Sequence, residues 1–379
     1  MAGRSRPSPL RKFAAVAGTL SVAALPAIAA PVTQTWLDEQ VEQIHEDYGL
    51  IALGAGVLEV GGEPVIAVAG TESSSSDTPV AKDAAWHIGS NTKALTALLY
   101  GRLVEQGAAE WGASVASLFG GEVDVIDPAW NDVTIEGLFA HRSGAGQIGP
   151  VWLLSRAGDE SPLTEQRLET VRSRLAKPPP EEIGAFEYSN LNYIIAGSAI
   201  EAITGLRWED AIRVQVFEFD GSDWSAGWGF GAPQSGPVGH NTVFGFKVAA
   251  GRGSGADNPP ALGPAGTAHA PIESHLRLLA TFIDDDSDLL AEDTREKLLA
   301  PWPDEDADYA MGWGVGTRDM LGGIYAHRGS NTMWLSHAEL IPEKDAVLIV
   351  NTNIYTERAS EAVGALVSAI EARLAASVD

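Results

Sequence analysis

Segments typical of β-strands lie at both ends of this 379-residue chain, and a long stretch of helical periodicity separates them. Residues 51–59 and 64–69 are rich in β-forming residues, and the Gly61-Gly62-Glu63 link between them is typical of a hairpin. Short links near the C-terminus favour antiparallel pairing of further β-rich segments, which are 310–315, 324–327, 333–340 and 346–351. Because strands from both ends can share one sheet, we expect an α/β (α+β) fold: an antiparallel sheet flanked by helices, with an inserted all-helical lobe.

The expected lobe covers about residues 90–299, and the α/β part covers about 30–89 and 300–379. Helical periodicity is clearest at 133–140, 163–176, 191–204 and 208–216, with flanking helices at 32–48 and 358–376. Residues 226–271 are dense in Gly and Pro, and a loop of this length inside a globular chain is usually functional or mobile. A cleft between the two parts is the expected place for a site.

The composition excludes several classes of function. Hydrophobic residues make up 45% and charged residues 20%, which is typical of a globular protein. Acidic residues outnumber basic ones by 51 to 25, and the net charge of −26 argues against a nucleic-acid partner or an anionic membrane surface. The absence of cysteine excludes disulfides and thiolate catalysis, and the scattered histidines give no support for a metal site.

The first 29 residues have the pattern of a bacterial-type signal peptide. A basic segment that contains Arg4 and Arg11 precedes an apolar run, and Ala27-Ile28-Ala29 matches a small-x-small cleavage site. The sequence therefore predicts a secreted or periplasmic protein, with residues 1–29 removed and 30–379 forming the mature domain. A single uncleaved N-terminal membrane anchor is the alternative.

Ser90-Asn91-Thr92-Lys93 stands where a helix is expected to begin. Residues i and i+3 share a helix face, so the Lys93 amine can reach the Ser90 hydroxyl. A partly desolvated lysine can take the proton of a serine nucleophile, and the helix N-terminus adds positive potential. The alternative is a helix-capping serine followed by a solvated lysine. The G-x-S-x-G motif of α/β-hydrolases is absent.

Two more clusters lie downstream. Tyr188-Ser189-Asn190 stands where an extended segment ends and a helix starts, so Asn190 is also a candidate N-cap. His327-Arg328-Gly329-Ser330 ends an expected strand, and Gly329 would let a substrate lie close to the strand backbone. A simple strand-to-turn junction is the alternative for this second cluster.

In this order, the three clusters resemble the S-x-x-K, Y-x-N and K-T-G or H-x-G motifs of the serine β-lactamase and penicillin-binding-protein superfamily. The class C-like branch, with its DD-peptidases, D-aminopeptidases and esterases, is the most similar. The segments 138–144 and 184–190 add to the resemblance, which covers about residues 51–370. It implies one catalytic cleft with no metal and no organic cofactor.

The resemblance also implies roles for individual residues. Ser90 would be the acylated nucleophile and Lys93 its activator, while Tyr188 would relay protons as a phenolate favoured by Lys93. On the substrate side, Asn190 would hold the amide or ester side chain, and His327 would supply positive charge or a proton path. The backbone N–H groups of Ser90 and Ser330 would form the oxyanion hole, beside Gly329.

His327 stands where typical β-lactamases carry a lysine. A histidine with an ordinary pKa of about 6.5 is mostly neutral at pH 7, so recognition of a β-lactam carboxylate should weaken. Arg328 would point to the opposite face of the strand. This favours esterase or peptidase activity over efficient β-lactamase activity.

Other polar and aromatic residues carry weaker signals. His141 and Arg142 are interpreted as structural, with substrate contact as the alternative. His240 and the 257–260 segment would either cover the cleft or form surface loop. Four tryptophans could line an apolar pocket, but we interpret most of them as core residues. These are Trp224, Trp228, Trp313 and Trp334.

We therefore predict a secreted serine hydrolase that acts through a Ser90 acyl-enzyme. Its partner would be a small-molecule or peptide substrate: an ester or amide, including D-amino-acid peptides and β-lactams, with no nucleic acid and no membrane beyond the N-terminal segment. One alternative is a penicillin sensor that acylates slowly and turns over little. Another is a cell-wall structural protein with a silent site, in which Ser90 would lie far from Lys93.

Overall fold

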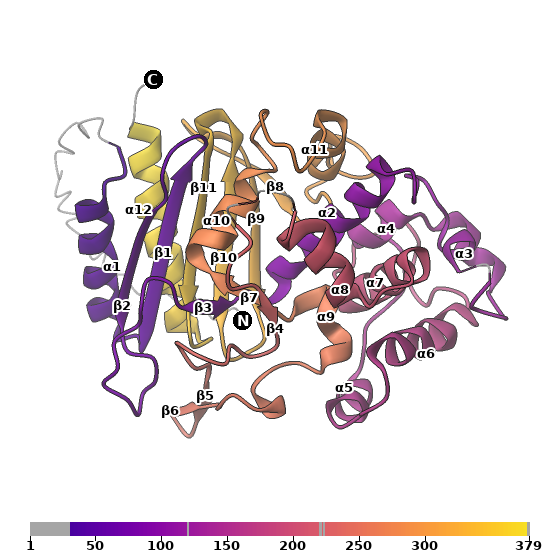
Figure 1. Cartoon of the computed structure of the whole chain (residues 1–379), viewed down its shortest axis with the longest axis horizontal. Helices are drawn as coiled ribbons and strands as arrows, with labels where there is room; N and C mark the ends of the chain where they lie inside the picture. The colour runs from indigo at the N-terminus through magenta and orange to yellow at the C-terminus, as the bar shows by residue number, and fades with distance from the viewer. Residues whose placement is uncertain (1–30, 120, 220–221, 223, 377–379) are drawn as a thin grey trace, which may run out of the picture.

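The computed structural model describes residues 31–119, 121–219, 222 and 224–376, and a six-stranded antiparallel sheet lies at its centre (Figure 1). The strand order is β2-β1-β11-β10-β9-β8, so the N-terminal hairpin joins the C-terminal strands through the β1–β11 pair. This confirms the predicted sheet built from both chain ends. The strands are β1 (Ala52–Glu59), β2 (Val65–Gly70), β8 (Gly314–Arg318), β9 (Gly322–Ser330), β10 (Leu335–Ile341) and β11 (Ala346–Thr352).

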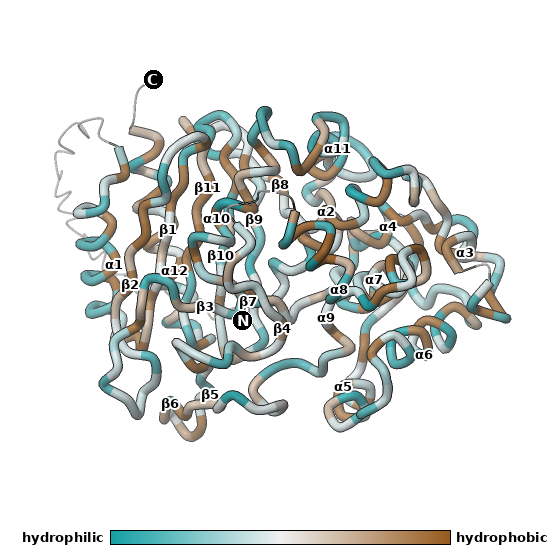
Figure 2. The backbone as a smooth tube through the Cα atoms, in the orientation of Figure 1, coloured by the Kyte–Doolittle hydropathy of each residue, from teal (hydrophilic) through white to brown (hydrophobic). Residues whose placement is uncertain are grey.

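Two terminal helices, α1 (Gln34–Tyr48) and α12 (Glu357–Ala376), cover one face of the sheet. The Thr33 side chain caps the start of α1, and Gly49 ends it in the left-handed conformation. Apolar residues of both helices pack on the sheet in one hydrophobic cluster, and Figure 2 shows hydrophobic residues along β1 and β11. Because both faces of these strands are buried, their sequences are nearly continuous apolar runs.

The opposite face of the sheet is covered by α10 (Ile272–Ala280), which packs against β1 and β11. Gly56 permits this approach, because a Cβ atom there would overlap the side chains of Ile272 and Leu276. This helix lies inside the segment from about 90 to 299 that was expected to form the helical lobe. The sequence pattern could not separate this sheet-packed helix from the helices of the lobe, because an amphipathic helix packs equally well on a sheet or on other helices.

The remaining helices form the lobe beside the sheet, on the right of Figure 1. Its longest members, α2, α6 and α7, match the expected helical segments closely, and α2 and α7 are buried along most of their length. The lobe contains α2 (Thr92–Glu105), α3 (Val115–Leu118), α4 (Ile135–Phe139), α5 (Pro150–Ala157), α6 (Leu163–Leu175), α7 (Asn190–Thr204), α8 (Trp208–Ile212), α9 (Gly263–Gly266) and α11 (Glu292–Leu299).

The Gly- and Pro-rich segment from 226 to 271 is more ordered than the sequence indicates. It contributes to a small sheet of order β3-β7-β4 and forms the hairpin β5–β6. The expectation of an all-helical insertion is therefore wrong for this segment, because its strands are too short to show a period. These strands are β3 (Ala85–His87), β4 (Gly229–Phe230), β5 (His240–Val243), β6 (Phe246–Ala249) and β7 (Ala268–Pro271).

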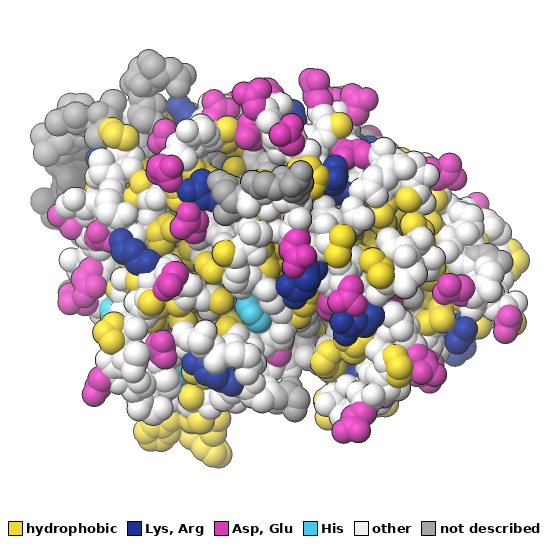
Figure 3. All heavy atoms as spheres, in the orientation of Figure 1, with side chains coloured by type: hydrophobic (Ala, Val, Ile, Leu, Met, Phe, Trp, Pro, Cys, Tyr) yellow, Lys and Arg dark blue, Asp and Glu magenta, His cyan; other side chains and the backbone are white. Residues whose placement is uncertain are grey.

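Acidic side chains are spread widely over the face of the molecule shown in Figure 3, in keeping with the net charge. Within the described part of the chain, no helix has the length and apolarity needed to cross a membrane. The predicted signal peptide, residues 1–29, lies outside the described residues.

Candidate active site

Ser90 and Lys93 meet at the junction between the sheet and the helical lobe. Ser90 lies in a 3-10 turn, Gly89–Asn91, that leads directly into α2, and Lys93 lies in the first turn of that helix. The Lys93 Nζ atom is 3.0 Å from the Ser90 Oγ atom. The helical i, i+3 spacing therefore places these groups in hydrogen-bond contact, which argues against a silent site.

The Lys93 amine is fully buried, and its partners are neutral. Its Nζ atom lies 2.8 Å from Asn190 Oδ1 and 2.6 Å from the Ala265 carbonyl oxygen. Within the described residues, no carboxylate forms an ion pair with it, and burial lowers the pKa of Lys93 well below its ordinary value.

This set of partners orients the amine. Asn190 Oδ1 and the Ala265 carbonyl oxygen only accept hydrogen bonds, so they use both N–H groups of a neutral amine. The remaining lone pair is then directed at Ser90, whose hydroxyl can donate its proton to it. The arrangement is suited to deprotonation of Ser90 by neutral Lys93.

Tyr188 lies at the mouth of the site and is 37% exposed. The Lys93 Nζ atom is 4.9 Å from the centre of its ring. Burial raises the pKa of Tyr188 to about 12, although a hydrogen bond with the Ser90 side chain lowers it. Tyr188 is therefore a neutral phenol at pH 7, which differs from the expected phenolate. In this state its hydroxyl can pass a proton but does not replace Lys93 as the base.

Asn190 is free to contact Lys93 because its neighbour caps the helix. The Ser189 hydroxyl accepts a hydrogen bond from the Leu191 backbone N–H and donates one to the Gly146 carbonyl oxygen. Asn190 is thus the first residue of α7 and not its N-cap, the alternative that the sequence left open. Its amide faces the reacting groups.

His327 lies on β9 behind the nucleophile and is almost completely buried. Its Nδ1 atom is 3.1 Å from Asn91 Oδ1, an acceptor, so Nδ1 carries the proton and Nε2 has a free lone pair. Burial lowers the pKa of His327 to about 3. The ring is neutral at pH 7, so of the two expected roles the geometry supports a proton path and not a positive charge.

The backbone around Gly329 and Ser330 packs directly on the turn that carries the nucleophile. A Cβ atom at Gly329 would overlap the Ile88 carbonyl oxygen and come within 2.7 Å of the Ser90 nitrogen. A Cβ atom at Gly89 would in turn overlap the Ser330 nitrogen. The glycines therefore bring together the two backbone segments expected to supply the oxyanion hole. Gly329 thus serves the contact between these two segments, and the expected approach of a substrate at this position stays a prediction.

The sequence did not identify the α9 segment as part of the site. The Thr96 hydroxyl donates to the Pro264 carbonyl oxygen at 2.7 Å, one residue before the Ala265 carbonyl that accepts from Lys93. These contacts use backbone carbonyls, for which any residue serves, so no side-chain pattern marks them. Asn91 was also missed, although it directly follows the nucleophile.

Asp257 connects the Gly- and Pro-rich segment to the strand that precedes the nucleophile. Its Oδ1 atom is 2.9 Å from His87 Nε2 and accepts a hydrogen bond from the Asn331 amide at 2.7 Å. His240, in contrast, is buried between the Ser74 backbone N–H and the Asn353 carbonyl oxygen. The 257–260 segment therefore braces the site, while His240 makes structural contacts.

His141 lies beneath Tyr188, with ring centres 4.2 Å apart, and its Nδ1 atom accepts from the Ser189 backbone N–H. Arg142 donates to the Gly184 carbonyl oxygen. These contacts support the structural interpretation of both residues.

Trp228, Trp313 and Trp334 are buried in the core, and Trp224 packs against it. Among the described residues, no group of His, Asp and Glu side chains is arranged to hold a metal ion.

A serine, a buried lysine and a tyrosine that meet between an antiparallel sheet and a helical lobe define the serine β-lactamase and penicillin-binding-protein superfamily. The Beta-lactamase family model matches residues 37–371, and the chain belongs to this family. This confirms the resemblance found in the sequence.

Two curated relatives match part of the chain. The unguisins hydrolase ungD' of Aspergillus campestris is 29% identical over 153 residues, which is 39% of this chain and 28% of the relative. Penicillin-binding protein 4 of Amycolatopsis lactamdurans is 28% identical over 138 residues, 36% of this chain and 35% of the relative. The matches thus span about a third or less of these relatives.

Solved structures with the same fold cover much more of the chain. SurE aligns with a TM-score of 0.72 and 21% identity over 91% of this chain and 76% of its own. D-amino acid amidase from Ochrobactrum anthropi SV3, complexed with L-phenylalanine amide, aligns with a TM-score of 0.69 and 19% identity over 89% and 99%. An octameric penicillin-binding protein homologue from Pyrococcus abyssi aligns with a TM-score of 0.68 and 20% identity over 88% and 77%.

Proposed function

We propose that this protein is a secreted serine hydrolase that cleaves small amides and esters, D-amino-acid amides and peptides among them, through an acyl-enzyme on Ser90. The contact between Ser90 and the Lys93 amine carries the proposal. This amine is buried, and no carboxylate of the described residues forms an ion pair with it. Burial lowers the pKa of Lys93 and so favours its neutral amine, which is the form that can accept a proton as a base.

The reaction would proceed in two halves. The Ser90 Oγ atom attacks the substrate carbonyl carbon while its proton moves to Lys93, and the backbone N–H groups of Ser90 and Ser330 stabilise the oxyanion. The C–N or C–O bond then breaks, and the leaving group takes the proton from Lys93 through the Tyr188 hydroxyl. Water attacks the acyl-enzyme in the second half, which releases a carboxylic acid and restores Ser90.

The neutral state of His327 supports amides and esters as substrates over β-lactams. A β-lactam carries a carboxylate, and burial lowers the pKa of both Lys93 and His327, which disfavours a cation that could bind it in this site. Arg328 is exposed and lies opposite His337 in the strand register, so it points away from the face that carries His327. The relatedness to D-amino acid amidase in fold suggests the class of acyl donor to test first.

Intact-protein mass spectrometry after acid quenching tests the proposal. The mature protein and its Ser90→Ala variant are incubated with p-nitrophenyl butyrate, D- and L-phenylalanine amide, and a fluorescent penicillin, and product release is followed in parallel. We expect Ser90-dependent acyl adducts and steady turnover of the ester or an amide. Stable penicillin labelling without turnover of any donor would instead favour the sensor, and equal hydrolysis by Ser90→Ala would overturn the mechanism.

Secretion has a separate test. Expression of the full chain in a bacterial host, followed by N-terminal sequencing of the exported protein, is expected to give a mature chain that begins at Ala30. Retention of residues 1–29 on a membrane-bound product would support the anchor instead.

A further inference from the structure

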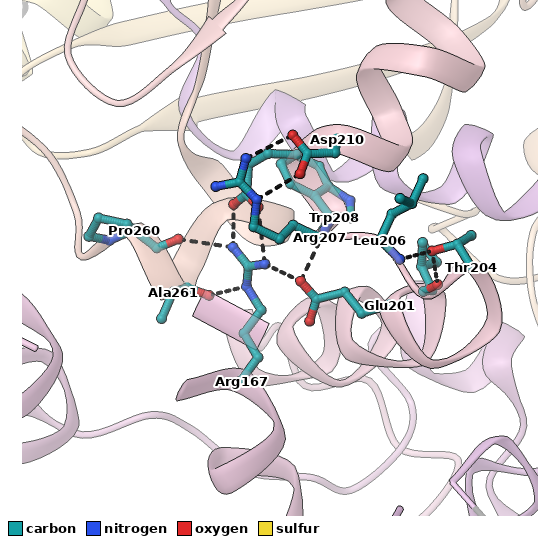
Figure 4. Close-up of polar contacts among 11 residues, drawn as sticks. Arg167, Glu201, Thr204, Leu206, Arg207, Trp208, Asp210, Pro260 and Ala261 are labelled. Atoms are coloured by element: carbon teal, nitrogen blue, oxygen red, sulfur yellow. Dashed lines mark hydrogen bonds and ion pairs between the residues drawn. The ribbon is translucent and has the colours of Figure 1, made fainter. Parts of the chain in front are cut away.

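A buried ion cluster joins three helices of the lobe, α6, α7 and α8 (Figure 4). Arg167 of α6 is fully buried, and its guanidinium group contacts the carboxylates of Glu201 on α7 and Glu209 on α8. It also donates to the carbonyl oxygens of Ala261 at 3.0 Å and Pro260 at 3.1 Å. All five N–H groups of the guanidinium thus have acceptors.

The acceptors of Lys93 lie on α7, which Arg167 contacts through Glu201, and on α9, which adjoins the carbonyls that bind Arg167. Asn190 is the first residue of α7, the helix that also carries Glu201. Ala265 lies on α9, which starts directly after the segment whose carbonyls bind Arg167. Ser90, the third partner of Lys93, lies in the turn before α2, away from the described residues that form hydrogen bonds or ion pairs with Arg167.

The α9 segment is held closely on both sides. A Cβ atom at Gly263 would come within 2.7 Å of a Glu209 carboxylate oxygen and 2.8 Å of an Arg167 nitrogen, so only glycine fits against the ion cluster. On the other side, the Thr96 hydroxyl of α2 binds the Pro264 carbonyl oxygen. A displacement of the ion cluster would therefore be transmitted to Ala265 over a short and tightly packed path.

We propose that Arg167 is a positioning residue for Lys93. By fixing α7 and α9 relative to each other, it places the two acceptors that use the N–H groups of the Lys93 amine and so keeps the lone pair directed at Ser90. The catalytic effect of this positioning rests on the proposed function. The protonation state of the Lys93 amine, in contrast, can be measured without any substrate.

The test is the titration of Lys93 by NMR in protein labelled with 13C-lysine, with the resonance assigned through a Lys93→Met variant. Arg167→Lys keeps the positive charge but loses the planar set of five donors. We expect a higher Lys93 pKa in this variant, because a loosened α9 admits water that stabilises the ammonium form. The acid limb of the pH profile of kcat/KM should shift upward with it, and kcat/KM at pH 7 should fall by about 10- to 100-fold.

Arg295→Lys is the matched control. Arg295 is also a buried arginine, and it pairs with Asp285 and donates to the Leu290 carbonyl oxygen; among the described residues, neither of these partners lies on α7 or α9. This variant is expected to lower the melting temperature while the Lys93 pKa stays at the wild-type value. If Arg167→Lys does not fold, the triple variant Arg167→Met, Glu201→Gln, Glu209→Gln removes the buried charges together and serves in its place.

A Lys93 pKa equal to the wild-type value in a folded Arg167 variant would overturn the proposal, even if stability falls. A rise in both the Arg167 and Arg295 variants would also overturn it, since the effect would then follow from general loosening. Absence of any Ser90 acylation in the wild-type protein would contradict the proposed function, whereas the NMR comparison would still decide the role of Arg167.

Discussion

The two walls of the site are built in different ways. On the sheet side, the nucleophile turn and β9 are joined by backbone contacts that two glycines permit. On the helical side, Lys93 is placed by hydrogen bonds to α7 and α9, which the Arg167 ion cluster fixes behind them. The sheet wall therefore tolerates no added volume at its contact, while the helical wall depends on particular polar groups.

The two walls of the site therefore have different tasks in the proposed reaction. In the proposed mechanism the sheet wall presents the backbone N–H groups of Ser90 and Ser330, which are fixed in place and cost little reorganisation during a reaction. The helical wall sets a protonation state, because it buries an amine among neutral acceptors. Substitutions on the two walls should consequently differ in what they change: geometry on one, and pH dependence on the other.

The largest effect is expected from Lys93→Met, which removes the base but keeps the volume of the side chain. We expect kcat/KM to fall by about 100- to 10,000-fold, as is typical for loss of a general base. Because no carboxylate of the described residues pairs with the buried amine, its removal should raise the melting temperature. Ester hydrolysis and thermal unfolding measure the two effects, and a large activity loss with a lower melting temperature would contradict this account.

Gly329→Ala tests the sheet wall. The added methyl group would overlap the Ile88 carbonyl oxygen and push β9 away from the Ser90 turn, so we expect about a 100- to 1,000-fold loss in kcat. The acid limb of the pH profile should stay in place. Gly323→Ala on the same strand is the control, since its Cβ atom would meet Glu343 at an ordinary 3.5 Å. Equal activity in the two variants would refute the close-packing argument.

Asn91→Ala should have an intermediate effect, because it removes the link between the nucleophile turn and β9. His327 Nδ1 and the Ser336 hydroxyl would lose a buried partner, at a cost of about 1–3 kcal/mol in the free energy of unfolding. Urea denaturation measures this cost. A change well below that range would show that His327 and Ser336 find other partners.

The prediction with the smallest effect at neutral pH concerns stability, which should change as the pH becomes acidic. The folded-state pKa of His327 is about 3 against an ordinary 6.5, so the unfolded chain binds one more proton between these values. Each pH unit below 6.5 should then lower the free energy of unfolding by about 1.4 kcal/mol through this residue. His327→Asn should flatten the slope measured by urea denaturation, and so should His275→Phe, since burial also lowers the pKa of His275 to about 3. An unchanged slope in His327→Asn would show that the ring is solvated.

Much of the fold and the main site residues could be predicted because they leave side-chain patterns. The β-rich segments at both chain ends and the short links between them predicted the shared sheet, and the spacing of Ser90 and Lys93 predicted their contact. The role of α9 could not be predicted, since it depends on the carbonyl oxygen of Ala265 and on a glycine that accommodates Arg167. The protonation states of Tyr188 and His327 also depend on burial, which three-dimensional packing decides.

The most direct test of the central claim is the rate of Ser90 acylation as a function of pH. Stopped-flow measurement of the p-nitrophenol burst from p-nitrophenyl butyrate gives this rate for the wild-type protein and for Lys93→Met. If Lys93 is buried and neutral, the wild-type acylation rate should already be maximal near pH 7 and should fall only at lower pH. In Lys93→Met, this fall in rate at low pH should be absent. A rate that keeps rising toward the ordinary lysine pKa near 10.4, or an unchanged burst in Lys93→Met, would contradict the claim that Lys93 activates Ser90.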